Sequence, residues 1–155
     1  MKFFLFIMVL VSSIGHASDF DHLRSSKYWT TTPSVYVCNN TSIDTQVVKQ
    51  AVDFWVDQGF KINPHVSQKD CNRSIEVGQI VIEYFVPGGN PNYYNALANS
   101  YNFKHDSNHR AYSKIYVRKS LQNEVDIYKH EIGHSLGLED DFSNYESVMT
   151  HEKMY

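Results

Sequence analysis

Apolar residues recur along the chain at two periods, and these periods predict the main helices and strands. Ser34–Cys38 alternates and is rich in β-formers, which predicts a strand. From about Asp44 apolar residues recur at helical spacing, and Gly59 then follows as a stop, which predicts an amphipathic helix. Gln79–Val86 is the most apolar run beyond residue 17, and it predicts a central strand. The apolar helical positions are Val48, Ala51, Val52 and Trp55.

Shorter patterns fill the remaining length. Three further strands are expected at Phe60–Ile62, Ala96–Phe103 and Lys114–Arg118. Polar composition predicts a loop at Ser67–Ser74, and clustered glycine, proline and asparagine predict turns at Pro87–Asn95.

Residues 18–32 and residues 123–155 have different patterns and give different predictions. Ser18–Thr32 is polar and charged, and we expect an extended arm there. A second helix is expected from about Asn123 to Leu136, whereas Gly137–Tyr155 has no clear period. The order strand, helix, several strands, helix and irregular tail predicts an α/β (α+β) fold. We expect a mixed twisted sheet with two main helices on one side.

The first residues resemble a secretory signal peptide. Lys2 gives a charged start, Phe3–Val11 is an unbroken run of nine apolar residues, and Gly15 and Ala17 supply small residues for cleavage. A transmembrane anchor is the alternative, but spanning a bilayer takes about 20 residues. We therefore expect residues 1–17 to be removed and residues 18–155 to form a single secreted or periplasmic catalytic domain.

Charge and cysteine content narrow the class of protein. Without Lys2, 13 basic residues stand against 17 acidic ones, a net charge of −4, which disfavours nucleic acid and anionic membranes as partners. No glycine-rich phosphate loop occurs, which argues against a nucleotide enzyme. The two cysteines, Cys38 and Cys71, predict one disulfide in an oxidising compartment, with two independent buried thiols as the alternative.

The stretch H-E-I-G-H-S-L-G-L-E-D, residues 130–140, carries the candidate chemistry. Residues four apart on a helix share a face, so His130 and His134 can direct ring nitrogens at one zinc ion. Glu131 is about a quarter turn away and is placed to hydrogen-bond a water molecule on that ion. The helix keeps a core side opposite, formed by Val125, Tyr128, Ile132 and Leu136.

A catalytic zinc site needs a third protein ligand and an open fourth position. Gly137 follows the helix, where a left-handed residue turns the chain back. Asp140 then reaches the ion from a third side. Asp141 is its close rival, and the spacing favours Asp140.

This segment resembles the metzincin zinc peptidases, whose signature is H-E-x-x-H-x-x-G-x-x-H/D. The aspartate at the third ligand position is similar to snapalysin-type members. The family also has a methionine in a tight turn beneath the metal, and Met149 stands nine residues after Asp140. Weaker likeness to the matrixins lies in A-V-D-F-W of the first helix and in a substrate-binding edge strand at Ala96, Leu97, Ala98 and Asn99.

The resemblance implies a secreted zinc endopeptidase that acts as a monomer on extended peptide or protein substrates. It implies one catalytic zinc ion and makes Glu131 the general base. The chain departs from the family after Met149, where only six residues remain, so we expect a minimal C-terminal subdomain. His151 stands where some branches have a tyrosine, and it is either a transition-state donor or an exposed residue.

Other readings stay open. Matrixins hold a second, structural zinc in a region similar to His105, Asp106 and His109, but this set is incomplete and we favour a solvated loop. The same fold without catalysis would be a zinc-stabilised binding or inhibitory module. A different zinc-peptidase clan would use a distant glutamate as ligand, for which Glu146 and Glu152 are the late candidates.

Overall fold

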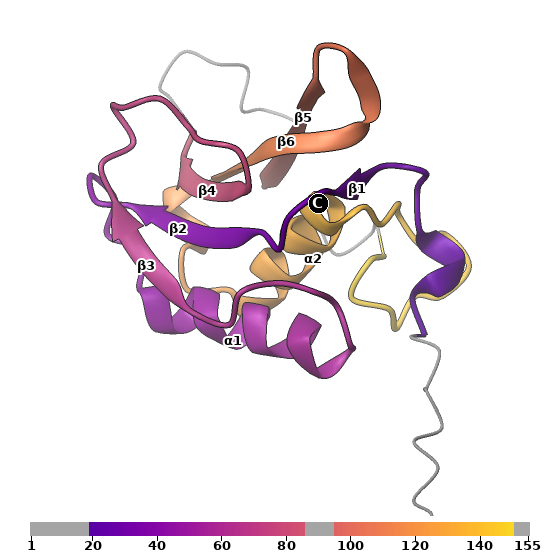
Figure 1. The fold of residues 1–155 in the computed structure, drawn as a ribbon. Coiled ribbons are helices and arrows are strands. Elements are labelled where there is room, and N and C mark those ends of the chain that lie inside the picture. The colour runs from indigo at the N-terminus through magenta and orange to yellow at the C-terminus, as the bar shows by residue number, and fades with distance from the viewer. Residues whose placement is uncertain (1–18, 86–94, 151–155) are drawn as a thin grey trace, which may run out of the picture.

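The computed structural model describes residues 19–85 and 95–150. Within these residues one six-stranded sheet is accompanied by two α-helices (Figure 1). The strands are β1 (Tyr28–Trp29), β2 (Ser34–Cys38), β3 (Val66–Lys69), β4 (Gln79–Tyr84), β5 (Ala96–Phe103) and β6 (Asp106–Val117). The helices are α1 (Thr45–Asp57) and α2 (Val125–Leu136), with short 3-10 turns η1 (Asp21–Leu23) and η2 (Lys119–Leu121).

The sheet has mixed strand direction, as expected from the sequence. Its order is β1-β6-β4-β2-β3, and all of these neighbours pair in parallel. Strand β5 pairs antiparallel with β6, and β6 is its only partner among the described strands. The predicted central strand is confirmed, because β4 lies between β6 and β2.

Both helices cover one face of the sheet (Figure 1). Alternate residues of β2 and β4 point into this layer and are fully buried: Val35, Val37, Ile80 and Ile82. Helix α1 buries the four apolar positions expected from its sequence, and the indole N–H of Trp55 donates to the Lys129 carbonyl at 2.8 Å. This contact joins α1 to α2, the helix that carries the candidate site.

Local signals set the ends of α1. The Asp44 side chain caps its start by accepting from the Gln46 N–H at 2.8 Å. Gly59 follows its last turn with φ at 81°, a value that glycine adopts without strain. The predicted helix is therefore confirmed.

Three predictions of strands and loops are wrong. Phe60–Ile62 is not a strand, although Phe60 and Ile62 are buried in the core. Part of the predicted loop Ser67–Ser74 belongs to β3, because an outer strand gains its backbone hydrogen bonds from β2 whatever its polarity. The strand predicted from Lys114 begins at Asp106, because β5 and β6 continue as a hairpin. Consequently Asp106 and His109 lie in a strand rather than in a loop.

The predicted extended arm is also wrong over its described part. From Asp19 onward the segment folds into η1 and β1, and Arg24 forms an isolated antiparallel bridge with Leu138. The expected signal peptide, Ser18 and residues 86–94 of the turn-rich segment lie outside the described residues. Beyond Gly137 the described chain has neither helix nor strand, in line with its lack of period.

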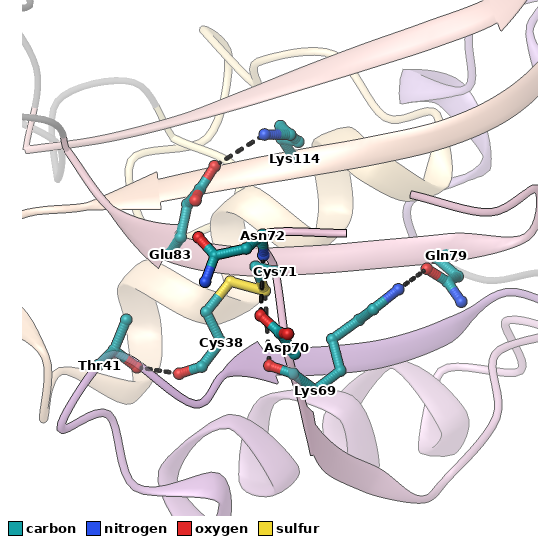
Figure 2. The surroundings of a disulfide bond; sticks show 9 residues. All are labelled: Cys38, Thr41, Lys69, Asp70, Cys71, Asn72, Gln79, Glu83 and Lys114. Carbon is teal, nitrogen blue, oxygen red and sulfur yellow. Dashed lines mark hydrogen bonds and ion pairs between the residues drawn. A yellow bond between two sulfur atoms is a disulfide. The ribbon is translucent and has the colours of Figure 1, made fainter. Parts of the chain in front are cut away.

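The predicted disulfide is confirmed. Cys38 and Cys71 are bonded, with their Cα atoms 5.4 Å apart, and the bond joins the end of β2 to the loop after β3 (Figure 2). Among the described residues, no helix combines the length and apolar character needed to cross a membrane.

Candidate metal centre

Three side chains converge at the C-terminal half of α2. The Nε2 atoms of His130 and His134 are 2.9 Å apart. The Oδ1 atom of Asp140 lies 3.4 Å from each of them. In the part of the chain that the structure describes, this is the group of histidine and carboxylate ligand atoms that could hold a metal ion, all within 4.8 Å of one another.

Backbone carbonyls orient both imidazoles. The Nδ1 of His130 lies 3.0 Å from the Val148 carbonyl, and the Nδ1 of His134 lies 2.9 Å from the Leu138 carbonyl. Because a carbonyl only accepts, each Nδ1 carries the hydrogen and each Nε2 directs its lone pair at the centre of the group. Such contacts fix ring orientation and raise the basicity of a metal-binding histidine.

Gly137 brings Asp140 back toward the helix. Its φ of 108° is left-handed, and the N–H groups of Gly137 and Leu138 bond to the carbonyls of His134 and Gly133. The Oδ1 atom of Asp140 is buried and accepts no hydrogen bond within the described structure. A buried carboxylate oxygen without a hydrogen bond is costly, and a cation between it and the two Nε2 atoms would offset that cost. The residues therefore fit a metal ion.

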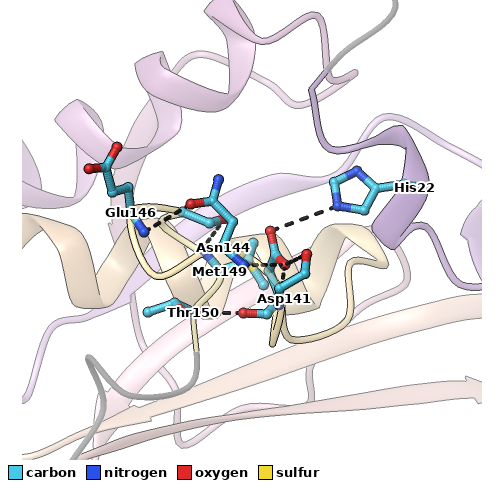
Figure 3. A network of polar contacts seen from close by, with 8 residues as sticks. His22, Asp141, Asn144, Glu146, Met149 and Thr150 are labelled. Carbon is cyan, nitrogen blue, oxygen red and sulfur yellow. Dashed lines mark hydrogen bonds and ion pairs between the residues drawn. The ribbon is translucent and has the colours of Figure 1, made fainter.

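Asp141 has a different environment from Asp140. Its Oδ1 accepts from the Ser143 N–H, the Ser143 hydroxyl and the Asn144 N–H at 3.0, 2.7 and 3.1 Å. These bonds, led by the hydroxyl of Ser143, lower the pKa of Asp141. Its Oδ2 lies 3.8 Å from His22 Nε2 (Figure 3). Asp141 thus stabilises the loop after α2 by hydrogen bonds, whereas Asp140 faces the two histidines.

Glu131 is buried beside this group. Only 2% of its surface is exposed, and burial raises the pKa of its carboxyl to about 8. A hydrogen bond from the Ala98 backbone opposes that shift, and the nearby Asp140 charge adds to it. Its Oε2 atom has no hydrogen-bond partner within the described residues. The contact with Ala98 places Glu131 against β5, the strand that the sequence singled out.

Met149 lies in a turn beneath α2. The turn is closed by the N–H groups of Ser147 and Thr150, which bond to the carbonyls of Asn144 and Ser147 at 3.1 and 3.2 Å. The Met149 side chain is fully buried, and its backbone accepts from the Asp141 N–H at 2.9 Å. The same turn supplies the Val148 carbonyl that orients His130.

The structure does not gather the other candidates into this group. Asp106 contacts His109 within β6, and the His109 ring packs on Tyr28 with centroids 4.5 Å apart. These residues and His105 belong to no described group that could hold a metal. The backbone N–H of Glu146 bonds to Asn144, and Glu146 is not a member of the His130 group. His151 and Glu152 lie outside the described residues.

No sequence pattern predicted the polar cluster around Arg110 at the C-terminal end of α2. The Arg110 guanidinium donates to the carbonyls of His134 and Ser135 at 2.6 and 2.7 Å, at the C-terminal end of α2. It also reaches the Ser100 hydroxyl of β5 at 2.7 Å. A cation at a helix C-terminus is favourable. This pairing depends on the β5–β6 register, which no local pattern reveals.

Comparison with models of protein families and with curated proteins finds no match to this chain.

Proposed function

We propose that this protein is a secreted, zinc-dependent endopeptidase with a metzincin-like site. The observation that carries the proposal is the convergence of two imidazole nitrogens and one buried carboxylate oxygen beside a second buried carboxyl group. His130, His134 and Asp140 would hold the ion, and Glu131 would be the general base.

The donor set suits zinc better than magnesium or calcium. Two imidazoles and one carboxylate are borderline ligands that favour zinc over magnesium or calcium, which prefer oxygen alone. Three protein ligands leave a fourth position for water, the arrangement of catalytic rather than structural zinc sites.

The chemistry then follows from the positions of the side chains. Bound zinc would supply Lewis acidity to a water molecule and to the substrate carbonyl. Glu131 accepts the proton of the attacking water and delivers it to the leaving amine. Burial raises the pKa of Glu131 when no ion is bound, and the positive charge of bound zinc would lower it again, so the carboxylate would be ionised and able to accept a proton near neutral pH.

The edge strand supports a peptide substrate. Strand β5 pairs with β6 along one side, so its other side can bind an extended chain through backbone hydrogen bonds. The hydrogen bond between Ala98 and Glu131 brings the base next to that edge. The signal-like residues 1–17 and the Cys38–Cys71 disulfide support export.

The competing function is a zinc-stabilised binding or inhibitory module. Such a module does not require Glu131, whose buried Oε2 makes no hydrogen bond to any described residue, and a group of this kind costs stability. In an enzyme, the same carboxyl group would be the general base, which explains why it is kept despite its cost in stability.

Zinc content and peptide cleavage test the proposal. The purified protein should carry about one zinc ion per chain and cleave casein-type substrates until a chelator is added. Glu131→Gln should keep the zinc and lose about 100-fold or more in kcat/KM. Glu124→Gln, an exposed change just before α2, is the matched control and should cleave normally. A zinc-loaded parent without cleavage would support the binding module, and an active Glu131→Gln variant would exclude Glu131 as the base.

A further inference from the structure

The N-terminal segment lies along the loop that carries Asp140. In Figure 1 the indigo chain around η1 runs beside the yellow loop after α2. Two backbone hydrogen bonds join them. The Ser25 N–H donates to the Gly137 carbonyl at 2.7 Å and the Glu139 N–H donates to the Leu23 carbonyl at 2.9 Å, and together they form the antiparallel bridge between Arg24 and Leu138.

We propose that Leu23–Ser25 is a positioning latch that holds two of the three metal ligands. This inference rests on the metal site of the proposed function. The bridged residue Leu138 supplies the carbonyl that orients His134, and Glu139 directly precedes Asp140. A small displacement of this loop would move both Asp140 Oδ1 and the partner of His134 Nδ1. The latch therefore sets ligand geometry from outside the motif.

The latch itself is anchored to the body of the domain. The Leu23 side chain packs against the core. The Arg24 guanidinium lies 4.5 Å from the centre of the Phe60 ring and bonds to Asp21 at 2.6 Å. On the other side of the latch, β1 pairs with β6, and the Trp29 indole donates to the Ser135 carbonyl at 2.8 Å. The segment is thus fixed at both ends, as a rigid support requires.

Two further contacts bind the same pair of segments. His22 lies 3.8 Å from Asp141 on the ligand loop (Figure 3). A Cβ on Gly137 would come within 2.9 Å of the Lys27 carbonyl oxygen, so the backbones approach closely there. Contacts therefore run from residue 22 to residue 27 against residues 137–141.

Ser25→Pro removes the N–H that bonds to Gly137. Arg24 has φ −67° and ψ 123°, a conformation that a following proline favours, so the change removes a donor without forcing the preceding backbone. Ser25→Ala is the control, because it keeps the N–H and loses only the hydroxyl that accepts from Lys27. Zinc affinity by chelator competition should fall about tenfold or more for Ser25→Pro, the usual size of a supporting-contact loss. Ser25→Ala should stay within about twofold of the parent by the same scale.

Cobalt substitution reports geometry separately from stability. The visible spectrum of the Co²⁺ form should change in Ser25→Pro and stay unchanged in Ser25→Ala. If the segment were merely structural, Ser25→Pro would lower the melting temperature and leave the spectrum unchanged.

Hydrogen exchange of the parent protein is a second measurement and needs no variant. Because coupling is reciprocal, zinc should slow hydrogen exchange of the Ser25 and Glu139 amides in the parent. The Asn39 amide, which bonds to Lys69 near the disulfide, should show no zinc effect.

The outcomes separate the two ideas. A parent that binds zinc but shows no zinc-dependent protection at Ser25 and Glu139, or an unchanged Ser25→Pro affinity and spectrum, overturns the latch alone. A parent that binds neither zinc nor Co²⁺ overturns the metal site and the latch with it.

Discussion

The Met149 side chain occupies the space that a Cβ would need on Gly133. A Cβ built there overlaps the Met149 sulfur and comes 2.8 Å from Cζ2 of Trp55. Gly133 lies between the two histidines of α2, directly before His134. The methionine turn and α1 therefore pack against the ligand helix at the one position where it lacks a side chain. The fit ties the metal face of α2 to the core.

Gly133→Ala should destabilise the protein. The methionine can shift, but the Trp55 ring is fully buried and held by its hydrogen bond to Lys129. Overpacking costs about 1–3 kcal/mol, against about 1 kcal/mol gained in helix propensity, so we expect a net loss of up to about 2 kcal/mol. Urea denaturation of the metal-free protein measures it. Adding Met149→Ala should recover part of the loss, and strictly additive effects would show that the two side chains do not compete for one space.

Alanine at Asp140 and at Asp141 should have opposite effects on the metal-free protein. Asp140→Ala removes a buried oxygen that accepts no hydrogen bond from residues 19–85 or 95–150, so stability should stay or rise while zinc affinity falls about 100-fold or more. Asp141→Ala removes the acceptor of three hydrogen bonds and should cost about 1–3 kcal/mol. Thermal unfolding with and without chelator gives both quantities. If Asp140→Ala destabilises the metal-free chain as much as Asp141→Ala, Asp140 serves the loop rather than an ion.

The sequence predicts the candidate site well because its parts are local. Two histidines one turn apart and a left-handed glycine place their groups by helix geometry alone, whatever the rest of the fold does. Helix α1 is predictable for the same reason, since Asp44 and Gly59 mark its ends.

The errors concern pairing between segments rather than the pattern within one segment. Strand β3 is polar, and only its pairing with β2 makes it a strand. The first half of β6 reads as a loop until β5 is placed beside it. The bridge between Arg24 and Leu138 spans more than 100 residues, and nothing in the polar composition of residues 18–32 indicates it. Register and long-range pairing are set by the assembled fold.

Gly137→Ala should weaken metal binding, and Gly59 provides the control. Both glycines have positive φ, 108° and 81°, so alanine is strained at each by about 1–2 kcal/mol. Among the residues that the structure describes, a Cβ at Gly59 meets nothing within 4 Å, whereas one at Gly137 meets the Lys27 carbonyl. We expect similar or larger destabilisation for Gly137→Ala and a loss of zinc affinity for that variant alone. Calorimetric zinc titration would contradict this if Gly59→Ala weakened binding equally.

Removing the disulfide should lower stability without affecting the metal site. The bond closes a loop with a sequence separation of 33 residues, for which chain entropy gives about 4 kcal/mol. It joins β2 to the loop after β3 (Figure 2), and the strand order places β3 at the edge of the sheet away from β5. The pair Cys38→Ala and Cys71→Ala should therefore unfold at lower urea concentration and bind zinc with the affinity of the parent below the transition. Adding reductant to the parent should reproduce the shift, and a large loss of zinc affinity in the folded variant would mean that the two sides of the sheet are coupled.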